Sequence, residues 1–308
     1  MNRDVTLLGP QRRPSLQHVV RDLDADAPIA TVTAGWLERE HEDGELRDML
    51  GGRGMNLGLH GRWLDVHEHD REFAHAERDH DLALAELRGM YLSRLDHALQ
   101  AAFDLGNPNE TRPRLSAAAF DDALEVIRLV DRQHLTRIGE AQQAFYSAWR
   151  PEERPAIAHH REEVWGLLAQ AQAVVVAGGH VGELLRVLHL FHVEPHLPRV
   201  VIAWSAGAMA LSERVVLFHD FVPHGVAQTE VFGAGLGVAR GVVPLPHLRR
   251  RLRVDDAARM SVLARRFAPA RCVALDDGVR LELPPDGEPP AGARVVADDG
   301  QIIEAGAA

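Results

Sequence analysis

Hydrophobic residues occur in short, nearly continuous runs toward both ends of the chain, and helix-length amphipathic stretches separate several of them. The runs are rich in Val, Ile and Ala and cover residues 5–8, 29–32, 173–177, 200–203, 241–243 and 272–275. Such runs are typical of strands buried on both faces, and their alternation with helices is typical of parallel sheets. The pattern predicts an α/β fold, with a mostly parallel sheet and helices on both faces.

The middle of the chain, residues 70–150, has a helical period instead. Its apolar positions are three or four residues apart, namely Leu84, Leu87, Tyr91, Leu95 and Leu99, followed by Phe120, Leu124, Ile127 and Val130. A Gly-, Pro- and Asn-rich stretch at 106–113 separates the two sets, and Ser116 is suited to an N-cap. We predict a long helical hairpin inserted into a single domain spanning 1–308. Residues 293–303 are predicted to form a terminal β-hairpin around a turn at 298–300.

Composition excludes several kinds of chemistry. The 308 residues are 46% hydrophobic and 26% charged, as in globular proteins, but all 34 residues of the Lys and Arg class are arginine, and Cys272 is the single cysteine. Without lysine there is no Schiff-base enzyme, no phosphate-loop lysine and no Ser/Lys dyad. A disulfide framework and a zinc site of several cysteines are likewise excluded.

The net charge of −11 argues against nucleic acid or an anionic membrane as the main partner, since both require a basic surface. Residues 1–10 lack the basic and apolar regions of a signal peptide, and no apolar run approaches the roughly 18 residues of a spanning helix. We therefore expect a cytoplasmic protein with no membrane partner.

Residues 200–211 are the most informative segment, because a buried strand runs directly into Ser205 and then into an apolar helix. This is the sequence form of a nucleophile elbow, in which a sharp turn lifts a serine hydroxyl above the sheet. The small residues Ala203 and Gly207 fit the steric requirement, and the helix N-terminus could stabilise an oxyanion. An ordinary strand-to-helix turn with a serine N-cap is the alternative interpretation.

A second buried strand, at 173–177, leads into Gly178, Gly179 and His180 before another helix. Neighbouring parallel strands end at the same edge of a sheet, where α/β folds place their sites. The backbone N–H groups of Gly178 or Gly179, together with that of Ala206, could then form an oxyanion hole. Phosphate binding is the competing use of such glycines, but the full dinucleotide fingerprint is missing.

A nucleophilic serine needs a base, and the base needs an orienting acid. Beyond the elbow, Asp220 follows an apolar run and His247 lies between a short strand and a helix. Any one of the 18 histidines is more often a surface or core residue than a catalyst. The chain order serine, acid, histidine is what makes the set coherent.

A set of segments stands out, namely AVVVAGGH, VVIAWSAGAMAL with an aspartate fifteen positions beyond its serine, a Pro-His pair, an Arg-rich helix and CVALDDGVRLEL. Together they resemble the dipeptidase E and cyanophycinase family of serine peptidases. The resemblance covers residues 173–305 and, more loosely, 5–66. It implies a class I glutamine amidotransferase-like fold, a flavodoxin-like three-layer sandwich. It also implies Ser205 as nucleophile, His247 as base, Asp220 as acid, and an oxyanion hole of Gly178, Gly179 and Ala206.

The chain departs from the family pattern at three positions, where Ala203 replaces a glycine, His180 an asparagine, and Leu245 a polar residue. His180, Trp204 and Asp277, which falls where relatives carry a glutamate, are candidates for supporting or substrate-binding roles. The insertion at 70–150 has no counterpart in the short dipeptidases, which puts the substrate class in doubt.

A histidine-rich stretch, with His67, His69, His75 and His80, suggests metal binding at first sight. If residues 64–69 end a strand, His67 and His69 share one side, with His75 or Glu77 as a third ligand. A solvated, histidine-rich start to the insertion is the interpretation that we favour, and no HExxH motif is present. We therefore predict no metal.

The leading hypothesis is a serine-type peptidase that cleaves a peptide or isopeptide bond, with aspartyl substrates suggested by the resemblance. It needs no cofactor and takes a small peptide as partner, and a homo-oligomer is an open option. The alternative is a catalytically silent binding or regulatory protein that uses the insertion as a partner or oligomer surface. A glutaminase-type amidotransferase fits the fold, but its nucleophile is a thiolate and the elbow carries serine.

Overall fold

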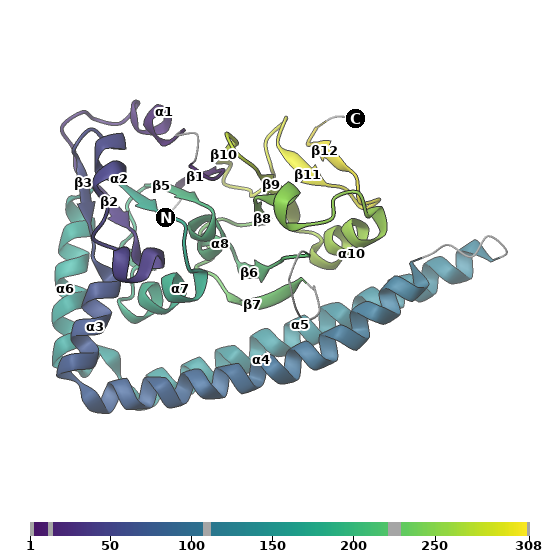
Figure 1. Ribbon diagram of the computed structural model, residues 1–308, viewed down its shortest axis with the longest axis horizontal. Helices are drawn as coiled ribbons and strands as arrows, with labels where there is room; N and C mark the ends of the chain where they lie inside the picture. The colour runs from purple at the N-terminus through teal and green to yellow at the C-terminus, as the bar shows by residue number, and fades with distance from the viewer. Residues whose placement is uncertain (1–2, 12–14, 107–111, 221–228, 307–308) are drawn as a thin grey trace.

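A largely parallel six-stranded sheet lies at the centre of the computed structural model, which describes residues 3–11, 15–106, 112–220 and 229–306 (Figure 1). Its strand order is β10-β1-β5-β4-β2-β3, and only β10 runs antiparallel to its neighbour. The strands are β1 (Asp4–Leu8), β2 (Ile29–Val32), β3 (Gly54–Asn56), β4 (Ala173–Val176), β5 (Val200–Trp204) and β10 (Arg280–Leu283). The prediction of an α/β protein with a mostly parallel sheet is therefore confirmed.

Two smaller sheets stand beside the central one. A four-stranded sheet has the order β12-β11-β9-β8, with β8 (Val242–Pro246) and β9 (Arg271–Leu275) parallel and β11 (Arg294–Val296) and β12 (Ile302–Glu304) antiparallel. A two-stranded sheet pairs β6 (Arg214–Leu217) with β7 (Glu230–Ala234). The predicted strands at 241–243 and 272–275 thus form β8 and β9 outside the central sheet, and the predicted terminal hairpin is β11 and β12.

Alternate residues of the central strands face two different cores, because side chains in a strand point to opposite faces. Ile29, Ala173, Val175 and Ile202 pack with α1 (Leu16–Val20) and α2 (Gly44–Met49). The residues between them, such as Val174 and Val201, face the larger core with α3 (Leu59–His69), α6 (Pro155–Gln170) and α7 (Val181–Leu190). Helices therefore cover both faces of the central sheet.

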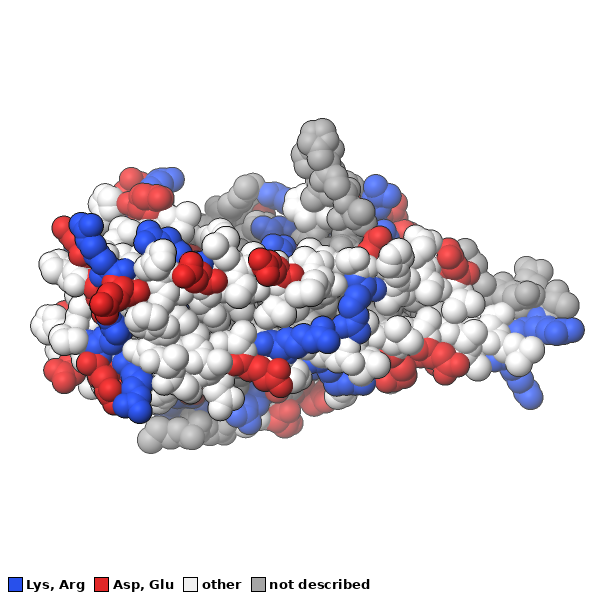
Figure 2. All heavy atoms as spheres, turned by 90° about the horizontal axis from the view of Figure 1, so that it is seen from below, with Lys and Arg blue, Asp and Glu red and all other residues white. Residues whose placement is uncertain are grey.

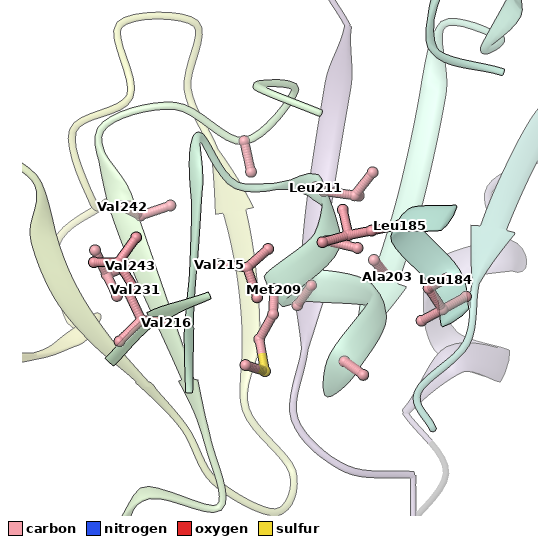
Figure 3. Close-up of a cluster of buried hydrophobic side chains, with 14 of the residues drawn as sticks. Leu184, Leu185, Ala203, Met209, Leu211, Val215, Val216, Val231, Val242 and Val243 are labelled. Atoms are coloured by element: carbon pink, nitrogen blue, oxygen red, sulfur yellow. The ribbon is translucent and has the colours of Figure 1, made fainter. Parts of the chain in front are cut away.

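The short helix α8 (Ala206–Leu211) connects the central sheet to the smaller sheets. All six of its residues are buried, so it has no solvent face. In Figure 3, α8 with Met209 and Leu211 lies between Ala203 and Leu184 on one side and Val215, Val216 and Val242 on the other. One continuous core thus joins β5 and α7 to the strands β6 to β8.

Two long helices, α4 (Arg71–Leu105) and α5 (Pro113–Trp149), pack along each other below the sheets (Figure 1). Tyr91, Leu95 and Leu99 of α4 and Phe120, Leu124, Ile127 and Val130 of α5 are all buried, as their helical spacing predicts. Ser116 is not an N-cap, because α5 begins at Pro113, whose fixed φ suits the first helical position. Residues 107–111 of the predicted loop lie outside the described residues.

The helices α9 (Leu248–Arg251) and α10 (Ala257–Phe267) follow β8, and short 3-10 turns occur at Ala34–Arg39, Pro151–Glu153 and Glu194–His196. Figure 2, a view from below onto α4 and α5, shows acidic and basic side chains interspersed along this face. No helix within the described residues is long and apolar enough to cross a membrane.

A buried ion pair fastens the long helices to the smaller sheets. The guanidinium of Arg266 on α10 donates two hydrogen bonds to the carboxylate of Asp131 on α5, at 2.7 and 2.6 Å. The hydroxyl of Tyr91 on α4 donates to the same carboxylate at 2.8 Å and accepts from the backbone N–H of Val231 on β7 at 2.9 Å. The side chains of Arg266 and Asp131 are 1% and 5% exposed, so neither charge is compensated by water.

We predict that Asp131→Asn destabilises the protein by about 3–5 kcal/mol, because it leaves the buried guanidinium of Arg266 without a counter-charge. The double variant Asp131→Leu with Arg266→Met removes both charges and should lose much less stability than the sum of the losses in Asp131→Leu alone and Arg266→Met alone. Urea unfolding of the unmodified protein, these two single variants and the double variant measures this difference. Additive losses would contradict the coupling of the two side chains.

A second ion pair closes the base of the long helices. Asp70 accepts the backbone N–H of Phe73 at 3.0 Å as the N-cap of α4, and it binds the guanidinium of Arg154 in bidentate fashion. The hydrogen bonds from Arg154 are the main cause that lowers the pKa of Asp70 from its ordinary value of 3.8. A lowered pKa in the folded protein stabilises it above the unfolded pKa, and this stability is lost as the pH falls through the folded value.

We predict that Asp70→Asn, which keeps a capping oxygen, costs about 1 kcal/mol at pH 7 through loss of the ion pair. The difference from the unmodified protein should begin to shrink below pH 3.8, the ordinary pKa, and vanish only below the lowered pKa of the folded protein, where the unmodified carboxyl is neutral as well. Chemical unfolding at a series of pH values tests this. A difference that stays constant down to the lowest pH at which the protein folds would contradict the electrostatic origin.

Candidate active site

Ser205 and His247 lie at the same edge of the structure, although their strands belong to different sheets. The last residue of β5, Trp204, pairs with Leu8 of β1, and Leu8 pairs in turn with Arg280 at the start of β10. The turn 276–279 leads back from β10 to the end of β9, where Leu275 pairs with Pro246 of β8. The carboxyl ends of β5, β1, β9 and β8 therefore follow one another along one edge.

The turn at 276–279 is held against β1 at Gly9. The N–H of Gly9 donates to the carbonyl of Val279 at 2.8 Å, and a Cβ at Gly9 would lie 1.9 Å from the carbonyl oxygen of Asp276. Only glycine permits this approach. It fixes the sheet that carries His247 beside the sheet that carries Ser205.

Ser205 adopts a backbone conformation that residues with a Cβ rarely take. Its φ is 51° and its ψ is −123°, at the junction between β5 and α8. Such a conformation costs on the order of 1–3 kcal/mol and persists only where the surroundings enforce it. The turn predicted from the small residues around Ser205 is thus sharp and strained, and its side chain remains half-buried rather than enclosed.

Two glycines make this turn sterically feasible. A Cβ at Gly207 would lie 2.3 Å from the carbonyl oxygen of Val176, so α8 packs directly on the end of β4. A Cβ at Gly178 would lie 2.9 Å from the Cβ of Ser205 and 3.3 Å from its Oγ. The loop after β4 therefore lies against the Ser205 side chain, as the pairing of parallel strands predicts.

The backbone amides of Gly178 and Gly179 are unused within the described residues. The neighbouring amides of Ala177 and His180 donate to the carbonyls of Val32 and Gly35, at 2.9 and 2.7 Å, whereas those of the two glycines make no such bond. The amide of Ala206 belongs to the first turn of α8 and has no partner within the helix. Three N–H groups thus remain near the Ser205 hydroxyl.

His247 occupies the corresponding position after β8. It adopts a left-handed conformation, with φ 57° and ψ 36°, and its N–H donates to the carbonyl of Leu275 at 3.2 Å. Within the described residues, no hydrogen bond joins the Ser205 hydroxyl to the His247 ring. Catalytic hydrogen bonds are often long in unliganded enzymes and shorten when substrate binds.

Asp220 is buried and lies beside the segment that follows His247. One of its carboxylate oxygens accepts the N–H of Arg253 at 2.9 Å, and the other accepts a guanidinium N–H of Arg259 at 3.0 Å. Its own N–H donates to the carbonyl of Arg251 at 2.7 Å. The described hydrogen bonds of the carboxylate thus hold the segment between α9 and α10, and the proposed contact with His247 stays a prediction.

Strand register places Asp276 next to His247, although the local sequence pattern does not indicate it as a site residue. It directly follows Leu275, which pairs with the residue before His247. Its carboxylate accepts the N–H of Arg249 at 3.4 Å, and one carboxylate oxygen is buried without a hydrogen-bond partner within the described residues. Asp277 instead pairs with Arg250 at 3.5 Å in an exposed position. The signal that could have found Asp276 is the parallel pairing of β8 and β9.

His180 and Trp204 flank the serine from two sides. The ring of His180 caps α7 by accepting the N–H of Glu183 at 3.1 Å, and the side chain is otherwise exposed. Trp204 is buried in the core beneath α1 and α2. His180 is therefore exposed at the start of α7, whereas Trp204 is buried below the turn, and their supporting or substrate-binding roles stay predictions.

The single cysteine is remote from this chemistry. Cys272 is buried within β9, and burial raises the pKa of its thiol to about 12. A thiol with so high a pKa is a poor nucleophile at neutral pH, since the thiolate is the reactive form.

The premise of the histidine cluster is wrong, because residues 64–69 belong to helix α3 and not to a strand. His67 Nε2 lies 2.6 Å from Glu77 Oε2, His69 pairs with Asp65, and His75 lies exposed beside Asp79. His80 stacks on Phe145, with ring centroids 4.4 Å apart. Among the described residues, no group of three or more His, Cys, Asp or Glu side chains is arranged to hold a metal ion.

No family model matches this chain, and no curated protein is significantly similar to it in sequence. A crystal structure of a peptidase from an acI-B1 actinobacterium aligns over 97% of this chain and 88% of its own, at 14% identity and a TM-score of 0.37. A likeness of this degree assigns neither fold nor function, so the functional inference rests on the geometry of the site.

We predict that Ser205→Gly is more stable than Ser205→Ala by about 1–3 kcal/mol, because glycine adopts a φ of 51° without strain. Both changes remove the hydroxyl, so a difference in stability between the two variants reports the cost of the backbone conformation. Gly207→Ala should destabilise severely, since its Cβ would clash with the carbonyl of Val176. Thermal unfolding compares the three variants, and equal stability of Ser205→Gly and Ser205→Ala would refute the strain.

Proposed function

We propose that the protein is a serine-type peptidase that hydrolyses a peptide or isopeptide bond through an acyl-enzyme. The observation that carries this proposal is the strained conformation of Ser205 beside the unused amides of Gly178 and Gly179. Strained residues of this kind cluster at active sites, and a glycine pair next to a serine hydroxyl suits an oxyanion hole. A class I glutamine amidotransferase-like arrangement, with serine in place of cysteine, is part of the same proposal.

In the proposed mechanism, Ser205 Oγ attacks the substrate carbonyl while the His247 ring takes the hydroxyl proton. The amides of Gly178 or Gly179 and of Ala206 stabilise the negative charge on the carbonyl oxygen. His247 then donates the proton to the leaving amine, and the C–N bond breaks. Water, deprotonated by the same ring, attacks the acyl-enzyme, the ester bond to Ser205 Oγ breaks, and the ring returns the proton to Oγ as the acid product leaves.

Two carboxylates are candidates for the residue that orients His247. Asp220 has the expected chain order, but its described hydrogen bonds go to Arg253 and Arg259. Asp276 follows the strand that pairs with the strand of His247, and its buried Oδ2 accepts no hydrogen bond within the described residues, although Arg249 and Arg294 lie 3.7 and 3.9 Å from it. The acid acts by fixing the tautomer and stabilising the charged ring, so its replacement should lower kcat strongly.

We predict that a fluorophosphonate probe labels the native protein at Ser205, and that Ser205→Ala abolishes labelling. His247→Ala should slow labelling by at least about a hundredfold, since general-base catalysis contributes roughly 10²–10⁴-fold. Asp220→Asn and Asp276→Asn, compared under the same conditions, identify the acid as the one with the larger loss. Asp277→Asn, in an exposed ion pair at the same turn, is the matched control.

Mass spectrometry of dipeptide libraries then gives the substrate, with Ser205→Ala as the control. Failure of the probe to label folded protein, or equal labelling of Ser205→Ala, would exclude the nucleophile. It would favour the alternative of a catalytically silent binding protein.

A further inference from the structure

A cavity of about 310 Å³ separates the long helices from α7 close to the candidate site. Its walls come from α4, α5, α7 and β7, and His180 and Gly182 belong to its lining. His180 is two residues beyond Gly178, where a Cβ would lie 2.9 Å from the Cβ of Ser205. The volume is at the lower end of the roughly 300–1,000 Å³ typical of small-molecule sites, so it suits one amino-acid side chain rather than a polymer.

The body of this cavity is apolar and aromatic. Leu84 and Ile138 line it from the two long helices, Leu185 from α7, and the rings of Phe145 and Phe232 from opposite sides. Such surface favours an apolar or aromatic group with little hydration of its own.

The charged groups that line the cavity already have partners. Asp81 Oδ2 accepts from Arg186 at 2.8 Å, Glu77 accepts from Trp63 at 2.8 Å, and Arg88 binds Glu230 in bidentate fashion. Glu183 lies 2.8 Å from His60 Nδ1. A charged ligand would have to compete with these pairs, and its own desolvation would add to the cost.

Two neutral polar groups in the wall have no hydrogen-bond partner within the described residues. Within the described residues, neither the Tyr146 hydroxyl nor the Gln142 amide makes a hydrogen bond, although both line the cavity. Burial raises the pKa of Tyr146 to about 12, so the hydroxyl remains a donor at neutral pH. Polar groups that face a cavity without partners are suited to hydrogen-bond a ligand.

We propose that this cavity binds a neutral aromatic side chain with a polar tip, such as tyrosine, of the residue that flanks the scissile bond. The ring would pack between Phe145, Phe232 and Leu84, and the phenol would bond with Tyr146 and Gln142. This assignment rests on the proposed peptidase function for its role, whereas the binding itself does not require catalysis. The insertion thereby acts as the specificity element of the enzyme.

The test measures binding in the Ser205→Ala background, which removes turnover. The probes are N-acetyl-tyrosinamide, N-acetyl-leucinamide, N-acetyl-aspartic acid amide and N-acetyl-lysinamide, titrated by ligand-observed NMR. We expect saturable binding of the tyrosine probe, about three- to tenfold weaker binding of the leucine probe, and the weakest binding of the two charged probes. Equal affinity for all four probes, or none for the tyrosine probe, overturns the assignment.

Two pairs of variants locate the binding. Leu84→Trp fills the cavity and should weaken the tyrosine probe at least about tenfold, whereas Leu82→Trp, at a position 65% exposed on the same helix, should leave it unchanged. Gln142→Met should weaken it about three- to tenfold, whereas Gln143→Met, at the neighbouring exposed position, should not. Equal effects within either pair would place binding elsewhere.

Tyr146→Phe is a variant that should fold normally, because removing a hydroxyl without a protein partner costs no stability. We expect an unchanged melting temperature and weaker tyrosine-probe binding. A lowered melting temperature would show that the hydroxyl is structural, contrary to the assignment. Probe binding without fluorophosphonate labelling would refute the peptidase function and leave the cavity assignment intact. Labelling without probe binding would refute the cavity assignment and leave the peptidase function intact.

Discussion

The close contact between the ends of β4 and β5 is the constraint on which the candidate site depends. Gly207 brings α8 onto the carbonyl of Val176, and Gly178 brings the loop after β4 onto the side chain of Ser205. Because the two strands are paired in parallel, neither end can retreat without breaking the sheet. The paired strands β4 and β5 thus hold Ser205 in its strained conformation. The helix α8, which is buried on all sides, also packs against β8, the strand that precedes His247.

The insertion is fixed to this framework as firmly as an ordinary core element. Arg266 and Asp131 join α10 to α5, Tyr91 joins α4 to β7, and the carboxylate of Asp70 closes the base. Long helices held at both the base and the middle form a rigid wall. A cavity between that wall and α7 therefore has a defined shape, which selectivity for one side chain requires.

The sequence predicted the elements that have a local hydrophobic pattern. It did not predict which strands share a sheet or which residues strand pairing brings together. Runs of Val and Ile identified six strands, and the spacing from Tyr91 to Leu99 identified the buried side of α4. The division of the strands between two sheets has no local signature, since β8 is as apolar as β5. The position of Asp276 could not be predicted for the same reason. His247 is 29 positions away in the chain and lies beside Asp276 only because β8 pairs with β9. The placement of His67 and His69 on one side had a different error. It assumed the two-residue period of a strand, whereas this segment is a helix.

The absence of lysine has a structural consequence at these contacts. Three of the ion pairs that hold the insertion use arginine, whose planar guanidinium binds a carboxylate through two parallel hydrogen bonds, namely Arg266 with Asp131, Arg88 with Glu230 and Arg154 with Asp70. A bidentate pair uses both oxygens of the acid, so little of its charge remains to attract another ion. The acidic side chains that line the cavity also have partners, since Asp81 accepts from Arg186, Glu183 lies 2.8 Å from His60, and Glu77 accepts from Trp63. The proposed preference for a neutral ligand therefore rests on these existing partners and on the Tyr146 hydroxyl and Gln142 amide, which have no hydrogen-bond partner within the described residues.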